Sequence, residues 1–225
     1  MKYSWLLFDA DDTLFDYPKA ENKALQWTFE EVGLSYLSDY LPIYHKYNQQ
    51  VWREFEQGTL TSLELRTKRF SLLFRELGID SDPSIFSPLY LKNLARGSDL
   101  FDGVPEILQI LSQSHHIGLV TNGLADVQRP RLKSSSIHSL IEKVFISEEM
   151  GAVKPEAAFF DLVFRQIGQP PREAVLIIGD SLTSDMLGGI QYGIHTCWFN
   201  PDRKTTDLSV TYEIHALQEL IPLLT

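Results

Sequence analysis

Short apolar runs alternate with amphipathic segments along much of the chain. One run opens the sequence at residues 3–8, and four more follow at residues 116–120, 143–147, 174–178 and 195–199. Each run is too short to cross a membrane and largely apolar, which is typical of strands buried on both faces of a parallel sheet. Apolar residues at helical spacing occupy residues 104–113 and 157–167 between them. The alternation predicts an α/β fold with a doubly wound parallel sheet, similar to the Rossmann fold.

Two prolines and a glycine bear on the helices of this sheet domain. Pro155 suits the first turn of the helix at residues 157–167, and Gly168 suits its end. Pro130 either starts or kinks a helix, and its position in the pattern does not separate these alternatives.

Residues 17–97 have a different pattern, because they contain no segment typical of a strand. Apolar residues recur at helical spacing in residues 19–32, 40–55, 61–77 and 83–94. Thr61 and Glu64 form a capping-box pattern, and Asp82 before Pro83 is a natural N-cap. We therefore expect an α-helical bundle at residues 17–97, inserted into an α/β domain made of residues 1–16 and 98–225.

The composition excludes several classes of function. Hydrophobic residues make up 44% of the chain and charged residues 22%, as in ordinary globular proteins. The net charge of −10 argues against a nucleic-acid polymer as a partner. No segment resembles a signal peptide or a membrane span, so we expect a cytoplasmic protein with no membrane partner. The single cysteine, Cys197, is expected to be a buried core residue. The oligomeric state has no signature in the sequence.

Acidic side chains follow two of the predicted strands. Asp9 and Asp11 come directly after the first strand, while Asp180 and Asp185 follow the fourth, after Gly179. Ligands of open parallel sheets bind beyond the carboxyl ends of the strands, so these carboxylates can share one crevice. Because close carboxylates repel, a hard divalent cation would stabilise them. Either pair alone is also explained by turns and helix caps.

Groups that can bind an anion follow the second and third predicted strands. Thr121 and Asn122 come after the second strand, and Lys154 lies in the loop after the third. A hydroxyl, main-chain amides and an ammonium group can hold phosphoryl oxygens. Taken singly, these residues are equally compatible with a turn and a solvated surface lysine.

The four motifs, in this order at four strand ends, resemble those of the haloacid dehalogenase superfamily. The matching segments are Asp9-x-Asp11-x-Thr13, Thr121-Asn122, Lys154-Pro155, and Gly179-Asp180 through Asp185. The resemblance covers essentially the whole chain, and the helical insert stands where the superfamily has its C1-type cap. Residues 8–15 and 120–123 are most similar to the subgroup of pyrimidine 5′-nucleotidases.

This resemblance implies a Mg²⁺-dependent phosphomonoester hydrolase that acts through an aspartyl-phosphate on a small molecule such as a pyrimidine nucleoside 5′-monophosphate. Asp9 would be the nucleophile, and Asp11 the general acid and base. Mg²⁺ would be held by Asp9, Asp180 and the main-chain carbonyl of Asp11, with Asp185 acting directly or through water.

The remaining roles that the resemblance implies concern the phosphoryl group and the leaving group. Lys154 would neutralise Asp9 and a phosphoryl oxygen, while Thr121 and Asn122 would bind the other oxygens. The cap would close over the crevice, with hinges near residues 15–18 and 95–98 where Gly97 permits bending. Tyr17, next to the first motif, is a candidate for contact with the substrate.

Three alternatives remain open from the sequence. The first is a sugar-phosphate phosphatase or phosphomutase. The second is a metal-free 2-haloacid dehalogenase, which the presence of Asp11 disfavours because those enzymes lack the second aspartate of the first motif. The third is a non-catalytic binding protein on the same scaffold.

Overall fold

The computed structural model describes residues 2–225 and divides into two compact units. The first unit contains the chain up to Asp16 together with Ser98–Ala125 and Leu132–Thr225. The second contains Tyr17–Gly97 and also Asp126–Arg131, a short segment that the sequence-based boundary left in the first unit. No helix among these described residues is long and apolar enough to cross a membrane.

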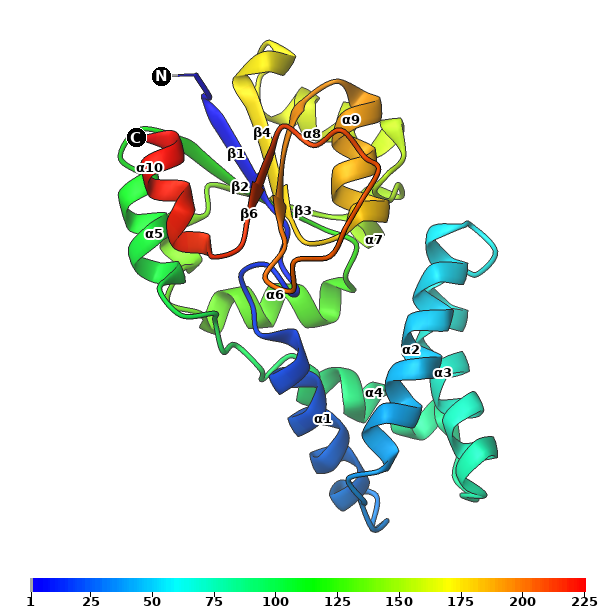
Figure 1. The fold of residues 1–225 in the computed structure, drawn as a ribbon. Coiled ribbons are helices and arrows are strands. Elements are labelled where there is room, and N and C mark those ends of the chain that lie inside the picture. Colours follow the sequence, from blue (N-terminus) through cyan, green and yellow to red (C-terminus); the bar gives the residue numbers. More distant parts are fainter. Residues whose placement is uncertain (1) are drawn as a thin grey trace. The chain divides into compact units, whose positions relative to one another are not determined.

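The first unit is built on a six-stranded parallel sheet with the order β3-β2-β1-β4-β5-β6 (Figure 1). The strands are β1 (Trp5–Phe8), β2 (His116–Thr121), β3 (Lys143–Ile146), β4 (Val175–Gly179), β5 (His195–Phe199) and β6 (Tyr212–Ile214). The first five confirm the predicted strands, and the doubly wound α/β fold is also confirmed. The strand β6 was not predicted, because it is a three-residue edge strand with no apolar run.

Helices cover both faces of this sheet (Figure 1). They are α5 (Val104–Leu111), α7 (Ser147–Met150), α8 (Ala157–Gln166), α9 (Leu187–Tyr192) and α10 (Leu220–Leu224). A further helix, α6 (Ala125–Ser134), contains Asp126–Arg131 and so belongs largely to the second unit. Alternate residues of β1 point to opposite faces: Leu6 and Phe8 pack in one apolar cluster with α5 and α10, and Trp5 and Leu7 in another with α8. Burial on both faces explains why the inner strands are apolar without alternation.

The positions of Pro130, Pro155 and Gly168 match the predictions only in part. Pro130 lies inside α6, so it neither starts the helix nor ends it. The expectation that Pro155 lies in the first turn of α8 is wrong, because α8 begins at Ala157 after the N-cap Glu156. Gly168 follows the C-cap of α8 with a φ of +86°, a left-handed conformation that suits glycine.

The second unit is the expected helical bundle, with α1 (Tyr17–Glu31), α2 (Tyr40–Glu56), α3 (Ser62–Leu77) and α4 (Pro83–Leu94). Thr61 and Glu64 form the predicted capping box, and Asp82 accepts a hydrogen bond from the Ser84 amide as N-cap. Inside the bundle, Tyr44 is fully buried and stacks on Phe70.

A buried polar network links three helices of the bundle. Arg69 of α3 donates from Nη1 to Asn48 Oδ1 of α2 at 3.0 Å, and Asn48 Nδ2 donates to Glu21 Oε1 of α1 at 2.9 Å. All three side chains are almost completely buried, so each hydrogen bond offsets part of the cost of removing these groups from water.

Candidate active site

The strand order brings the first and fourth motifs together. After β1 the chain adds β2 and β3 on one side, then crosses to the other side of β1 and adds β4, β5 and β6. Phe8 of β1 lies opposite Ile178 of β4, and the Asp9 amide donates to the Ile178 carbonyl at 2.9 Å. Asp9 and Asp180 therefore leave neighbouring strands at the switch point of the sheet, where ligands of this fold bind.

Three carboxylates meet at this point. Asp9, Asp180 and Asp185 each have a carboxylate oxygen within 4.8 Å of the others. Asp185 lies in the π-helical turn Leu182–Met186, and its Oδ2 accepts a hydrogen bond from the Ser181 amide at 3.2 Å. A Cβ atom on Gly179 would lie 2.2 Å from Asp185 Oδ2. The absence of a side chain at Gly179 therefore leaves room for the Asp185 carboxylate.

The side chain of Lys154 lies between two of these acids. Its Nζ donates to Asp9 Oδ1 at 2.6 Å, to Asp185 Oδ1 at 2.6 Å and to the Val120 carbonyl at 2.9 Å. The Lys154 and Asp185 side chains are 1% and 0% exposed, whereas that of Asp9 is 12% exposed. Lys154 is thus a buried, fully hydrogen-bonded cation, and Asp9 keeps access to solvent.

Asn122 fixes the main chain that carries this lysine. Its Nδ2 donates to the Lys154 carbonyl at 2.8 Å, and its Oδ1 accepts from the Lys154 amide at 2.8 Å. The side chain of Asn122 therefore holds the Lys154 peptide groups, a role that was not predicted from the sequence. Beside it, the buried hydroxyl of Thr121 accepts from the Gly123 amide at 3.0 Å, which leaves its own O–H free to donate.

Hydrogen bonds hold both the side chain and the main chain of Asp180. Thr13, in the turn after β1, donates from Oγ1 to Asp180 Oδ1 at 3.2 Å. Trp198 of β5 donates from Nε1 to the main-chain carbonyl of Asp180 at 2.9 Å. From the sequence, Trp198 was predicted only as part of a buried strand, because an indole in an apolar run gives no sign of a distant acceptor.

Burial and repulsion shift the pKa values of these groups. Burial raises the pKa of Asp9 well above its ordinary range, with Asp185 and Asp180 adding to the rise and Lys154 opposing it. Burial, followed by repulsion from Asp185, raises the pKa of Asp180 to about 7. Burial alone would lower the pKa of Lys154, but attraction to Asp185 and Asp9 raises it above its ordinary value. The site as a whole thus favours additional positive charge.

The donor set fits a hard divalent cation. Three carboxylates face one ammonium group, so the local charge is negative when the acids are ionised. Carboxylate oxygens are the ligands that Mg²⁺ and Ca²⁺ prefer in proteins. Asp9, Asp180 and Asp185 would hold the ion. Asp11 lies half-buried in the turn after β1, and coordination by its main-chain carbonyl stays a prediction.

Tyr17, the remaining predicted site residue, is the first residue of α1 and belongs to the second unit. Its hydroxyl oxygen lies 3.4 Å from Asn48 Nδ2. Its contact with a substrate stays a prediction.

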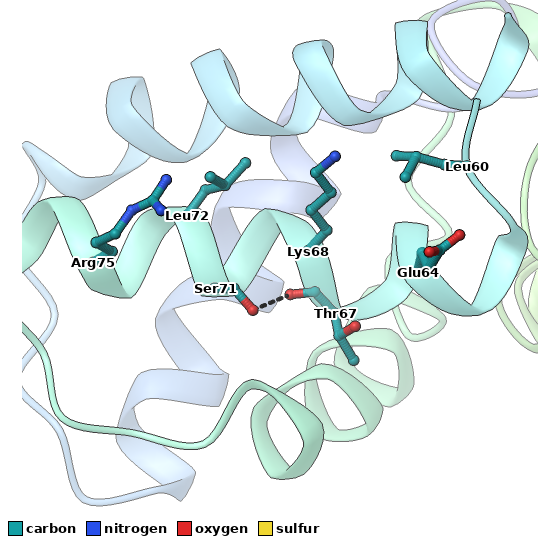
Figure 2. Close-up of a pocket in the computed structure, with 7 residues that line it drawn as sticks. All are labelled: Leu60, Glu64, Thr67, Lys68, Ser71, Leu72 and Arg75. Carbon is teal, nitrogen blue, oxygen red and sulfur yellow. Dashed lines mark hydrogen bonds between the residues drawn. The ribbon is translucent and has the colours of Figure 1, made fainter.

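A groove on α3 of the second unit lacks the chemistry of the three-acid site. Figure 2 shows its lining residues, which are Leu60, Glu64, Thr67, Lys68, Ser71, Leu72 and Arg75. Lys68 is paired with Glu54 at 2.8 Å, and Glu64 belongs to the capping box of α3. Two of its charged groups are thus already used within the bundle.

Cys197, on β5, is fully buried as expected. Burial raises the pKa of its thiol to about 12, so the thiolate that would act as a nucleophile is strongly disfavoured.

Comparisons with known proteins agree with this geometry. The chain is 39% identical to the Bacillus subtilis protein YfnB, assigned as a HAD-hydrolase, whose magnesium-bound crystal structure superposes with a TM-score of 0.94 and full coverage of both chains. It is 34% identical to the pyrimidine 5′-nucleotidase PynA of Streptococcus pneumoniae, over 98% of this chain and 94% of that protein. It is 31% identical to the pyrimidine 5′-nucleotidase YjjG of Escherichia coli, over 100% and 99%. Residues 6–199 match the family of haloacid dehalogenase-like hydrolases, and the chain therefore belongs to that family.

Proposed function

We propose that this chain is a Mg²⁺-dependent phosphatase that hydrolyses pyrimidine nucleoside 5′-monophosphates through an aspartyl-phosphate on Asp9. The observation that carries the proposal is the Lys154 ammonium, which lies 2.6 Å from both Asp9 and Asp185 in a group that also includes Asp180. A buried ammonium that neutralises one oxygen of a partly exposed carboxylate suits attack on an anionic phosphate ester.

In the first step, Asp9 Oδ2 forms a bond to phosphorus and the bond from phosphorus to the ester oxygen breaks. Asp11 gives its proton to the departing alkoxide. Lys154 keeps Asp9 Oδ1 hydrogen-bonded, which leaves Oδ2 as the attacking atom. Bound among the three acids, Mg²⁺ would offset the repulsion between the carboxylate and the phosphate dianion.

In the second step, a water molecule attacks phosphorus and Asp11 takes up its proton. The bond between phosphorus and Asp9 Oδ2 breaks, which releases phosphate and restores the carboxylate. The free O–H of Thr121 and the main-chain amide of Asn122 would bind phosphoryl oxygens, where negative charge lies in the transition state.

The choice of substrate is supported by PynA and YjjG, two pyrimidine 5′-nucleotidases that align with nearly the whole chain. Magnesium in the YfnB crystal structure supports the choice of metal.

A substitution at Asp9 tests the covalent route. Asp9→Asn should fold normally and lose phosphatase activity by about a thousandfold or more, because the amide is a poor nucleophile. Labelled phosphate from UMP should be recovered on acid-quenched wild-type protein and not on the variant. Asp202→Asn, at an exposed acid of the same unit, is the matched control and should retain activity. Full turnover by Asp9→Asn would refute the covalent route.

A screen of substrates tests the remainder of the proposal. Phosphate release from UMP and dUMP should exceed release from sugar phosphates, and excess EDTA should abolish it. Faster release from sugar phosphates would refute the nucleotidase assignment. Chloride release from 2-chloropropionate that persists in EDTA would instead indicate a metal-free dehalogenase.

A further inference from the structure

We propose that Trp198 is a positioning residue that sets the affinity of the site for Mg²⁺ by fixing the main chain of Asp180. The proposal rests on the proposed function, because it concerns how the same three acids hold the ion. Its central observation is the hydrogen bond from Trp198 Nε1 to the main-chain carbonyl of Asp180, at 2.9 Å.

The register of the sheet explains why this tryptophan can reach Asp180. Trp198 on β5 lies opposite Gly179, the last residue of β4, and Asp180 is the next residue along the chain. The Trp198 side chain is almost completely buried, and a buried indole N–H needs an acceptor. The Asp180 carbonyl supplies it.

Asp180 is therefore held by hydrogen bonds from both sides of β4. On the β1 side Thr13 donates to the carboxylate, and on the β5 side Trp198 donates to the main-chain carbonyl. Fixing the carbonyl oxygen fixes the peptide plane, and this in turn limits the directions that the side chain of Asp180 can take.

Preorganisation is valuable at this position because the acids repel one another. One oxygen of the Asp180 carboxylate lies within 4.8 Å of an oxygen of Asp9 and of Asp185, so repulsion favours rotation of Asp180 away from them when no metal ion is bound. Any rotation would have to be reversed when Mg²⁺ binds, and the cost would weaken binding. An indole N–H opposes the rotation without adding a positive charge that would compete with the ion.

Two changes at position 198 remove the donor. Trp198→Phe deletes the N–H together with part of the ring, and 3-benzothienylalanine introduced at the same position replaces the N–H by sulfur while keeping the shape of the side chain. The second change keeps the test valid if the phenylalanine variant fails to fold. Trp5→Phe is the matched control, since Trp5 is a buried tryptophan of β1 that stacks on His116.

The measurement is the dissociation constant for Mg²⁺, from titration calorimetry of the metal-free proteins. Loss of one hydrogen bond should raise this constant about threefold to tenfold in both variants at position 198. The metal dependence of activity should shift by the same factor, and Trp5→Phe should leave both quantities unchanged.

The measured constants distinguish a positioning role of Trp198 from a role in the core alone. A residue that serves only the core would lower the unfolding temperature without changing the dissociation constant, so an unchanged constant in the benzothienyl variant would overturn the proposal. Failure of the unaltered protein to bind Mg²⁺ would overturn the proposed function, and the positioning role with it. Weaker Mg²⁺ binding in the two variants at position 198, with unchanged binding in Trp5→Phe, supports both the proposed function and the positioning role of Trp198.

Discussion

Replacing Lys154 with methionine would remove the ammonium group that lies between Asp9 and Asp185 and keep a side chain of similar length. The lysine is 1% exposed and donates to two carboxylates at 2.6 Å. The variant would retain the acids and lose their buried cation.

The expected destabilisation follows from these distances. At 2.6 Å and an effective dielectric constant of about 20, each ion pair is worth roughly 6 kcal/mol of gross Coulomb energy. The substitution also removes the free-energy cost of burying the lysine's charge, and this gain offsets much of the lost Coulomb energy. Removing one partner of a buried ion pair therefore lowers the free energy of unfolding by about 3–5 kcal/mol. For a chain of 225 residues this corresponds to a fall in Tm of roughly 6–20 °C.

Differential scanning calorimetry of the metal-free protein measures this effect. Lys143→Met is the matched control, because Lys143 is an exposed lysine at the start of β3 in the same unit, and its Tm should change by less than about 2 °C. Saturating Mg²⁺ should recover part of the loss in Lys154→Met, since the ion supplies positive charge to the same acids. A Tm for Lys154→Met equal to that of the control would refute the argument that the ammonium group stabilises the buried acids.

Three further predictions concern the same unit. Gly179→Ala should weaken Mg²⁺ binding by more than about tenfold in a calorimetric titration, because its Cβ would lie 2.2 Å from Asp185 Oδ2 and displace that carboxylate; unchanged binding would contradict this. Asn122→Ala removes both hydrogen bonds to the Lys154 peptide groups, so it should cost about 1–3 kcal/mol and speed amide exchange at Lys154, as measured by mass spectrometry. Equal amide exchange at Lys154 in the variant and in the unaltered protein would contradict this role of Asn122. Cys197 is buried with a pKa raised to about 12, so a thiol reagent should modify it only after unfolding, and rapid labelling of the native protein would show the assignment as a core residue to be wrong.

The architecture was largely predictable because it depends on local patterns. Five strands follow from runs that must be apolar on both faces, and the bundle follows from helical spacing with local caps such as Thr61 and Asp82. The exception, β6, is a short edge strand with polar Glu213 in its centre, and such a strand has no pattern to detect. The prediction for Pro155 failed for a different reason. Proline suits the first turn of a helix, but this proline lies just before α8 begins.

The amino-acid sequence alone identifies the chemical groups at the strand ends: the acids at 9, 11, 180 and 185, the lysine at 154, and the hydroxyl at 121. Strand exits are local features, so the type of chemistry could be inferred from them. Only the tertiary structure decided that Lys154 is buried between Asp9 and Asp185, that Asn122 holds the lysine by its main chain, and that Trp198 reaches the Asp180 carbonyl. Each of these contacts joins residues that are distant in the chain and adjacent only because the strand order β3-β2-β1-β4-β5-β6 brings the ends of their strands together. Local patterns carry no information about such partners, because strand order and register arise from packing of the whole sheet.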